Sequence, residues 1–210
     1  MRQKLVDRIN VIPVVLVKYV EELKIVVEVI SGNMSIEAFV DGSAHPNPGP
    51  GGFGVIVLDK DKNFEYNNYK LVEVYTKQFN KTTNNEQELK ALLYVFLKYG
   101  VNINNREFTE IPIVYSDSAY AINTYENWMF NWARNGWRKS DKKTPENLEL
   151  IQAYYDWYQK GYRIDLRKVK GHSDNLYNNY ADLLATGKAN VEEIKQMITN
   201  FTSEVKDNFN

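Results

Sequence analysis

Residues 35–59 read SIEAFVDGSAHPNPGPGGFGVIVLD, two apolar segments on either side of a loop rich in Pro and Gly. The first segment alternates apolar and polar residues as far as Asp41, a pattern that predicts a strand over 35–41. The second segment, 52–59, predicts another strand, and the Pro/Gly loop predicts a return of the chain between them. The stretch therefore predicts a pair of strands, the first of which ends in an aspartate.

The pattern on the C-terminal side of this stretch mixes strands with helices. Apolar residues recur at helical spacing after Thr82 and Thr83, either of which can cap a helix that stops at Gly100. The segment 111–117 (IPIVYSD) predicts a buried strand that again ends in an aspartate, Asp117. Further elements are expected as a strand at 62–75, short helices within 118–133, a helix at 146–160, a strand at 162–171 and a helix at 177–187. This order predicts an α/β fold, a mixed sheet with helices packed on it.

Composition limits the chemistry that this chain can perform. Its 210 residues include no cysteine and only two histidines, His45 and His172. Disulfide scaffolds, thiolate zinc sites and cysteine nucleophiles are thereby excluded, so any metal would be held by oxygen ligands, which favours Mg²⁺ or Mn²⁺. The net charge of −1 gives no overall sign of nucleic-acid binding, which leaves local basic patches to supply it.

Two basic patches stand out, over 134–143 (RNGWRKSDKK) and 163–170 (RIDLRKVK). The first has five basic residues against one aspartate, a balance of +4, and the second has four against one, a balance of +3. Each patch is either a phosphate-binding surface or an ordinary solvated face.

Three zones are expected along the chain: a Val/Ile-rich N-terminal extension (1–33), a central domain dense in strand and turn signals (34–187) and a C-terminal helical extension (188–210). The N-terminal extension contains VIPVVLVKYVEELKIVVEVI (11–30), which charged residues interrupt too often for a membrane span and which lacks signal-peptide features. Its composition predicts no cleanly amphipathic helix. We expect a soluble, cytoplasmic protein. Residues 1–33 are either a genuine extension that packs or pairs as an extra element, or upstream sequence in a protein whose translation starts at Met34; we expect them to be dispensable.

Four carboxylates are placed where they could converge. Asp41 and Asp117 end apolar strands, and ligands bind at the carboxyl ends of strands in α/β sheets. Glu88 lies near the start of the first helix and Asp182 in the last one (YADLLA). Taken singly, each is better explained as a cap or a surface acid. Together they would repel one another unless a cation such as Mg²⁺ shared them.

Four linked segments resemble one family, type 1 ribonuclease H. They are FVDGSAHPNPGPGGFGVIV (39–57), TTNNEQELKAL (82–92), YSDSAY (115–120) and VKGHSDNLYNNYADLLA (169–185), in the family's order. The resemblance implies a five-stranded mixed sheet, three antiparallel strands then two parallel, with helices packed on it. It also implies endonucleolytic hydrolysis of the RNA strand of RNA–DNA hybrids.

The matched positions imply catalytic, metal-binding roles for Asp41, Glu88, Asp117 and Asp182; Glu86 is set aside because the family's glutamate directly precedes Leu. Two Mg²⁺ ions, for which Mn²⁺ can substitute, would share Asp41 and flank the scissile phosphate. One activates water and the other stabilises the leaving 3′-oxygen, which gives 5′-phosphate and 3′-hydroxyl ends. His172 matches the family's histidine that assists water activation or product departure, and Asn178 matches an asparagine that orders this loop.

Hybrid recognition is implied at three places. Asn47, Asn84 and Asn85 would contact the minor groove together with backbone groups of 42–44, although Asn84 and Asn85 could equally be helix caps. Thr83 and Asn147 would bind a phosphate of the DNA strand. The segment 131–143 resembles the basic protrusion of bacterial members, in which the residues expected to cover the DNA are Trp137, Arg138, Lys139, Lys142 and Lys143, with Arg134 nearby and Trp132 closer to the core.

Two departures from the family are visible. Ala119 stands where many relatives have a base-contacting glutamine, and Ala44 where cysteine is frequent. Two other hypotheses are a catalytically inactive hybrid-binding module and an RNase H-like nuclease domain of a mobile element. The presence of all four acids favours an active enzyme over the first, and the lack of polymerase sequence argues against the second. We expect a monomer whose partner is the hybrid.

Overall fold

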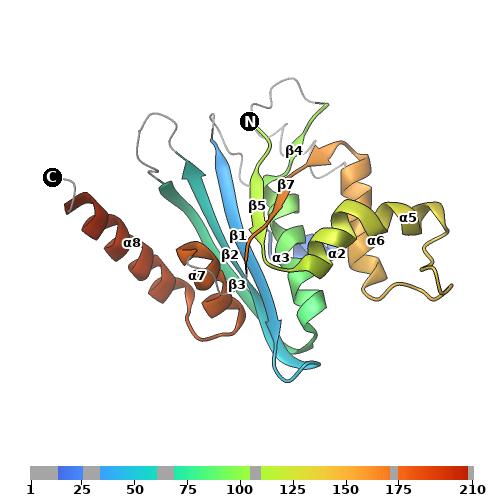
Figure 1. The fold of residues 1–210 in the computed structure, drawn as a ribbon, viewed down its shortest axis with the longest axis horizontal. Coiled ribbons are helices and arrows are strands. Elements are labelled where there is room, and N and C mark those ends of the chain that lie inside the picture. The colour runs from blue at the N-terminus through green and yellow to red at the C-terminus, as the bar shows by residue number, and fades with distance from the viewer. Residues whose placement is uncertain (1–13, 26–33, 61–68, 105–109, 171–174, 208–210) are drawn as a thin grey trace.

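The computed structural model describes residues 14–25, 34–60, 69–104, 110–170 and 175–207 (Figure 1). A five-stranded sheet in the order β3-β2-β1-β5-β7 forms its centre. The strands are β1 (Ile36–Ala44), β2 (Gly49–Lys60), β3 (Tyr69–Thr82), β5 (Ile113–Ser116) and β7 (Asp165–Lys168). The pairs β1–β2 and β2–β3 are antiparallel, whereas β1–β5 and β5–β7 are parallel. The mixed sheet predicted from the sequence is confirmed.

One face of the sheet is covered by α3 (Asn84–Tyr99), which packs on β1 and β2. Beyond α3 on this side lie α4 (Ala119–Asn123), a π-helical turn η1 (Thr124–Trp128), α5 (Met129–Arg134) and α6 (Leu148–Gln159). Strands β4 (Val101–Asn102) and β6 (Tyr162–Arg163) form a separate two-stranded sheet, which the sequence patterns do not indicate. The main hydrophobic cluster lies between these helices and the sheet.

The opposite face is covered by α7 (Leu176–Ala185) and α8 (Val191–Asp207). Strand residues alternate between the two sides: Val55 and Val57 join the main cluster, while Ile56 and Leu58 join a second cluster with Leu184 of α7. Because both faces are covered, β2 needs the nearly continuous apolar run that its sequence shows. The terminal helix expected after residue 188 is α8, whose Ile194 and Ile198 are buried.

Several element boundaries differ from those expected. The third strand was expected at 62–75; residues 62–68 of that range lie outside the described residues, and β3 as described runs over Tyr69–Thr82, directly into the helix cap. Its second half (TKQFNKT) is polar because β3 is an edge strand with half-exposed positions, so alternation alone could not detect it. The last strand, expected as one piece at 162–171, is divided between β6 and β7, which belong to different sheets.

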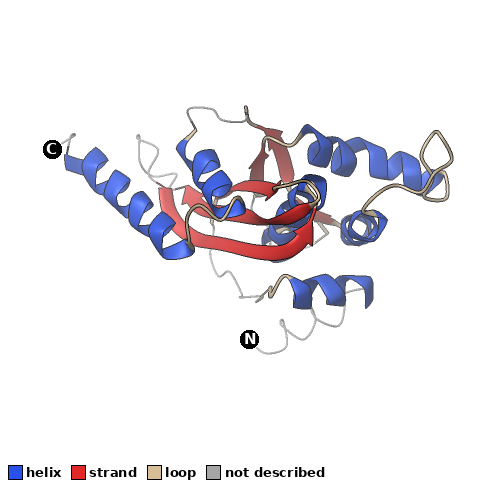
Figure 2. Cartoon of the chain, turned by 90° about the horizontal axis from the view of Figure 1, so that it is seen from below, coloured by secondary structure: helices blue, strands red, loops and turns tan. Residues whose placement is uncertain are grey.

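The N-terminal segment contains a helix, α2 (Val14–Glu22), where no amphipathic helix was expected. Packing explains it, because Tyr19, Leu23 and Ile25 are buried in the main hydrophobic cluster, and such burial outweighs the modest helix propensity of valine. Figure 2 places α2 and α7 on opposite sides of the sheet. The expectation that residues 1–33 are dispensable stays a prediction, and this packing argues against it. Over the described ranges, no helix has the length and apolar character to cross a membrane.

Candidate active site

Two aspartates lie side by side at the carboxyl edge of the sheet. Asp41 belongs to the central strand β1, and Asp117 follows the last residue of β5. Val40 pairs with Ser116 in the parallel ladder between these strands, so the next residue of each strand emerges at the same edge. The local sequence sets this placement, since each buried apolar run ends at its aspartate.

Glu88 reaches the same edge from the first turns of α3. The helix begins after Thr83, whose side chain accepts a hydrogen bond from the Glu86 amide over 3.2 Å. The backbone of α3 lies directly on β1 at Gly42, where an added Cβ would overlap backbone atoms of Gln87 and Glu88. This close approach, possible only at glycine, brings the Glu88 carboxylate beside Asp41.

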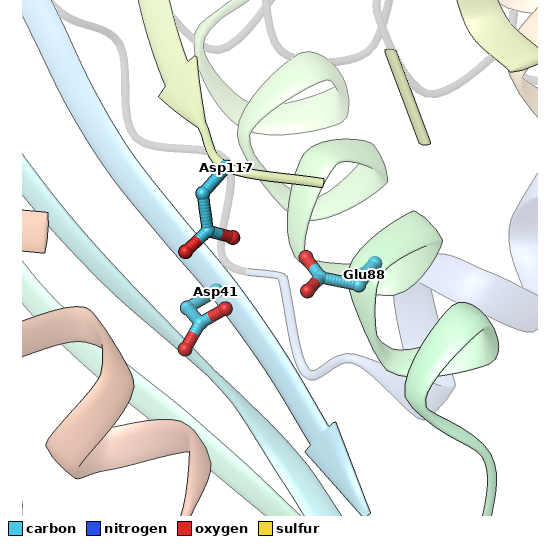
Figure 3. A group of neighbouring side chains, drawn as sticks. All are labelled: Asp41, Glu88 and Asp117. Atoms are coloured by element: carbon cyan, nitrogen blue, oxygen red, sulfur yellow. The ribbon is translucent and has the colours of Figure 1, made fainter. Parts of the chain in front are cut away.

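The three carboxylates form one group. Each of Asp41, Glu88 and Asp117 offers an oxygen, and these oxygens lie within 4.8 Å of one another. Figure 3 shows the three side chains converging from β1, α3 and the end of β5. Asp182 of α7 lies outside this tight group but lines the same pocket of about 230 Å³. The structure thus brings together the four acids named from the sequence, whereas Glu86 turns away to Lys90.

Burial and mutual repulsion make these acids hard to ionise together. Burial, together with the charges of Asp117 and Asp182, raises the pKa of Asp41 to about 8, although hydrogen bonds from the Gly42 amide and with Glu88 act in the opposite direction. Burial and the charges of Asp41 and Asp117 likewise hold the pKa of Glu88 well above its usual range. Asp41 and Glu88 are hydrogen-bonded through their side chains, so without a cation the pair holds a proton.

A divalent cation fits this group. Buried Glu88 Oε2 has no hydrogen-bond partner among the described residues, and the Glu88 carboxylate lies in a group with those of Asp41 and Asp117. Binding of Mg²⁺ or Mn²⁺ would satisfy this unpartnered oxygen, because both cations prefer clusters of hard oxygen ligands. Binding of either cation would also relieve the repulsion that raises the two pKa values.

Polar side chains predicted to contact substrate surround this pocket. Asn84 lines the pocket, and its side-chain Oδ1 accepts a hydrogen bond from the Ala44 backbone amide. The backbone amide of Asn84 donates to Asn47 Oδ1 over 3.2 Å. The cap is Thr83, so Asn84 and the half-exposed Asn85 do not fill that role. Asn178 also lines the pocket; it is 2% exposed, and its Oδ1 has no partner within the part of the chain that the structure describes.

The predicted DNA-contacting residues lie apart from the carboxylates. Asn147 precedes α6 in a left-handed conformation (φ 55°), and its side chain makes no capping hydrogen bond to that helix. Trp137 packs edge-on against Tyr155, and both it and Trp132 are partly buried against the main cluster. The basic side chains of the following loop are solvent-facing or half-exposed: Arg138, Lys139, Lys142 and Lys143.

One predicted residue, His172, lies outside the described residues. Gly42 and Ser43, whose backbone groups were expected to contact the substrate, line the pocket, as does Asn179, which sequence reasoning did not single out. Asn179 directly follows Asn178, so adjacency was the available signal.

Comparison with known proteins gives a consistent result. A family model described as RNase H matches residues 33–190. The protein described as Ribonuclease H from Thermoanaerobacter sp. (strain X514) is 36% identical over 171 residues, covering 80% of this chain and 95% of that protein. Ribonuclease H from Acetivibrio thermocellus (strain ATCC 27405) is 38% identical over 163 residues, covering 77% and 95%.

Solved structures share the fold. LC9-RNase H1, described as a type 1 RNase H with the type 2 active-site motif, has a TM-score of 0.53 at 23% identity, covering 73% of this chain and 71% of that one. LC11-RNase H1 in complex with an RNA/DNA hybrid has a TM-score of 0.50 at 18% identity, covering 76% and 98%. Since the family model spans most of the sequence and the two sequence relatives match along nearly their whole length, this chain belongs to the RNase H family.

Proposed function

We propose that this chain is a metal-dependent endonuclease that hydrolyses the RNA strand of RNA–DNA hybrids, leaving 5′-phosphate and 3′-hydroxyl ends. The observation that carries the proposal is the convergence of Asp41, Glu88 and Asp117, with Asp182 in the same pocket, in a member of the RNase H family.

A different element of the fold supports each of the four acids. Asp41 is fixed by the central strand, Asp117 by the parallel neighbour, Glu88 by α3 and Asp182 by α7. These four would hold two Mg²⁺ ions, or Mn²⁺ in their place. When bound, the ions would supply Lewis acidity and would neutralise charge that builds up on the phosphate during displacement by water. The carboxylates remain ionised to hold them, and their rigid supports fix their orientation before the substrate arrives.

The polar side chains around the carboxylate pocket are suited to binding an RNA–DNA hybrid. The hydrogen bonds from Ala44 and to Asn47 fix Asn84 beside the carboxylates, where an amide can donate to or accept from a 2′-hydroxyl. Asn85 would contact the same groove, Thr83 and Asn147 the DNA phosphate, and the loop after α5 the DNA backbone. Asn178 would order the last loop, in which His172 is proposed to assist water activation or product departure.

Cleavage of a hybrid with labelled RNA tests the proposal directly. We expect internal cuts in the RNA strand only, with 5′-phosphate ends, in the presence of Mg²⁺ and none with chelator. RNA duplex and DNA duplex of the same sequence serve as substrate controls. Hybrid binding without cleavage under every metal condition would instead support the inactive binding module.

A further inference from the structure

The N-terminal helix α2 is attached to the sheet and to α3 by polar contacts as well as by its buried side chains. The Tyr75 hydroxyl of β3 donates to the Leu23 carbonyl over 2.7 Å, and the Lys77 ammonium donates to the Glu22 carbonyl. Both contacts satisfy carbonyl groups at the C-terminal end of α2. The end of this helix is therefore held at a defined place on the edge strand.

A buried lysine links α2 to α3. Lys90 Nζ lies 2.6 Å from Glu22 Oε1 and 2.9 Å from Glu86 Oε1, and the lysine side chain is only 6% exposed. The same ammonium lies 4.1 Å from the centroid of the Phe79 ring. A charge buried to this extent depends on its partners, so removing one of the two carboxylates leaves Lys90 undercompensated.

From Glu86 the contacts continue into the turn between β3 and α3. The Thr82 hydroxyl donates to Glu86 Oε2 over 2.9 Å, and Gln87 Nε2 donates to the Thr82 hydroxyl over 2.7 Å. Thr82 is the last residue of β3, and the next residue, Thr83, caps α3. The network Glu22–Lys90–Glu86–Thr82 thus fixes the turn from which Thr83 and Asn84 project.

Building on the proposed function, we propose that Glu22 and Lys90 are positioning residues for hybrid binding. They hold the β3–α3 turn, through Glu86 and Thr82, in the conformation that presents Thr83 and Asn84 to the substrate. On this proposal the N-terminal segment contributes to substrate binding by positioning the β3–α3 turn. Glu88 projects from the next turn of the same helix but is supported by the close packing at Gly42, so the carboxylate group should be much less affected.

The sign of the expected effect separates positioning from general electrostatics. Glu22 is negatively charged, so if only overall charge mattered, Glu22→Gln would strengthen attraction of a polyanion. Positioning predicts the opposite, weaker binding. A matched control is Glu149 of α6, which also pairs with a lysine but not with Lys90. Its carboxylate lies 2.7 Å from the ammonium of Lys18, a residue of α2. Its side chain is 55% exposed, and Glu149→Gln removes the same charge.

The test uses the full chain and its Glu22→Gln, Glu22→Asp and Glu149→Gln variants, each first checked by thermal unfolding. Steady-state cleavage of labelled hybrid gives kcat and KM, and fluorescence anisotropy in chelator gives Kd without turnover. For Glu22→Gln we expect KM and Kd to rise roughly threefold to tenfold, which lies in the lower part of the range of coupling within such networks, with kcat within about twofold of wild type. Glu22→Asp, which retains the charge, should lie in between, and Glu149→Gln should bind as well as wild type or better.

Three results would overturn the inference: unchanged KM and Kd in Glu22→Gln despite a lowered melting temperature, an equal rise in Glu149→Gln, or a fall in kcat alone. Should Glu22→Gln not fold, the comparison of Glu22→Asp with Glu149→Gln decides by the same criteria. A wild-type chain that binds hybrid without cutting it would count against the proposed function and leave this inference measurable through Kd.

Discussion

Gly42 of β1 and Glu88 of α3 are in direct backbone contact, so close that any side chain at position 42 would overlap the helix. This contact joins the strand that carries Asp41 to the helix that carries Glu88. The spacing of two acids in the candidate metal centre is therefore set by one glycine that bears no chemistry itself.

Gly42→Ala should accordingly separate α3 from β1 and disrupt the group of three carboxylates. We expect a decrease of about 1–3 kcal/mol in the free energy of unfolding, as for other overpacked cores, together with a large decrease in hybrid cleavage. Gly187→Ala is the control: its backbone is left-handed (φ 69°), and an added Cβ would meet only the Gln78 side chain at ordinary van der Waals distance, so it reports the cost of conformation without a steric overlap. Equal destabilisation by the two substitutions, with cleavage intact in Gly42→Ala, would contradict the steric argument.

Asp41→Asn and Asp117→Asn should each abolish cleavage while leaving hybrid binding measurable. In the absence of divalent cation their melting temperatures should equal or exceed that of wild type, because each substitution removes an ionisable carboxyl from a buried, repulsive group. Added Mg²⁺ should raise the melting temperature of wild type more than that of either variant, since ligands that bind the folded state stabilise it. Wild-type-like turnover by either variant would refute the site assignment.

The raised pKa of Asp41 predicts how stability depends on pH in metal-free protein. Folded Asp41 titrates near pH 8 and unfolded aspartate near its ordinary value, so between these values the folded state holds the extra proton. Stability should therefore fall as pH rises through this window, by at least about 1 kcal/mol. Chemical denaturation in chelator across the window measures this slope, and Asp41→Asn should flatten it. A slope of opposite sign in wild type, or one unaltered in the variant, would show that other groups dominate.

The basic loop after α5 should act through phosphates. Neutralising Arg138, Lys139, Lys142 and Lys143 together should raise KM for hybrid and leave kcat nearly unchanged. The logarithmic salt slope should shrink by about 0.9 for each phosphate that the variant no longer neutralises on a duplex-like substrate. Two matched double variants refine the comparison: Lys142→Gln/Lys143→Gln in the loop, and Lys188→Gln/Lys195→Gln near and on α8. Equal effects from both pairs would identify the loop as an ordinary solvated face.

A chain that begins at Met34 tests the expectation of dispensability against the packing of α2. Removal of Tyr19, Leu23 and Ile25 uncovers part of the main cluster and leaves Lys90 with one carboxylate partner. From this packing we expect a lower melting temperature and a raised KM for hybrid, the latter in the same direction as for Glu22→Gln. A truncated chain with wild-type melting and kinetics would show that residues 1–33 are dispensable after all.

Local sequence patterns were enough to predict the central strands and to place Asp41, Glu88 and Asp117 on or beside predicted elements. Alternation in β1, the apolar run of β5 and the helical spacing of α3 are visible in the residues themselves, although β1 continues past Asp41 to Ala44. The catalytic roles of all four acids, Asp182 included, were implied by the resemblance to the family. The second half of β3 escaped because an edge strand buries too little for a regular pattern.

How these elements meet depends on contacts that exist only in the folded chain. The contact between Gly42 and Glu88 joins segments far apart in the chain, and no local pattern encodes it. The same holds for α2: its valines favour strand locally, yet burial of Tyr19 and Leu23 and the pairing of Glu22 with Lys90 make it a helix attached to α3. Local propensity is weak against such packing, and long-range burial is not visible in one sequence.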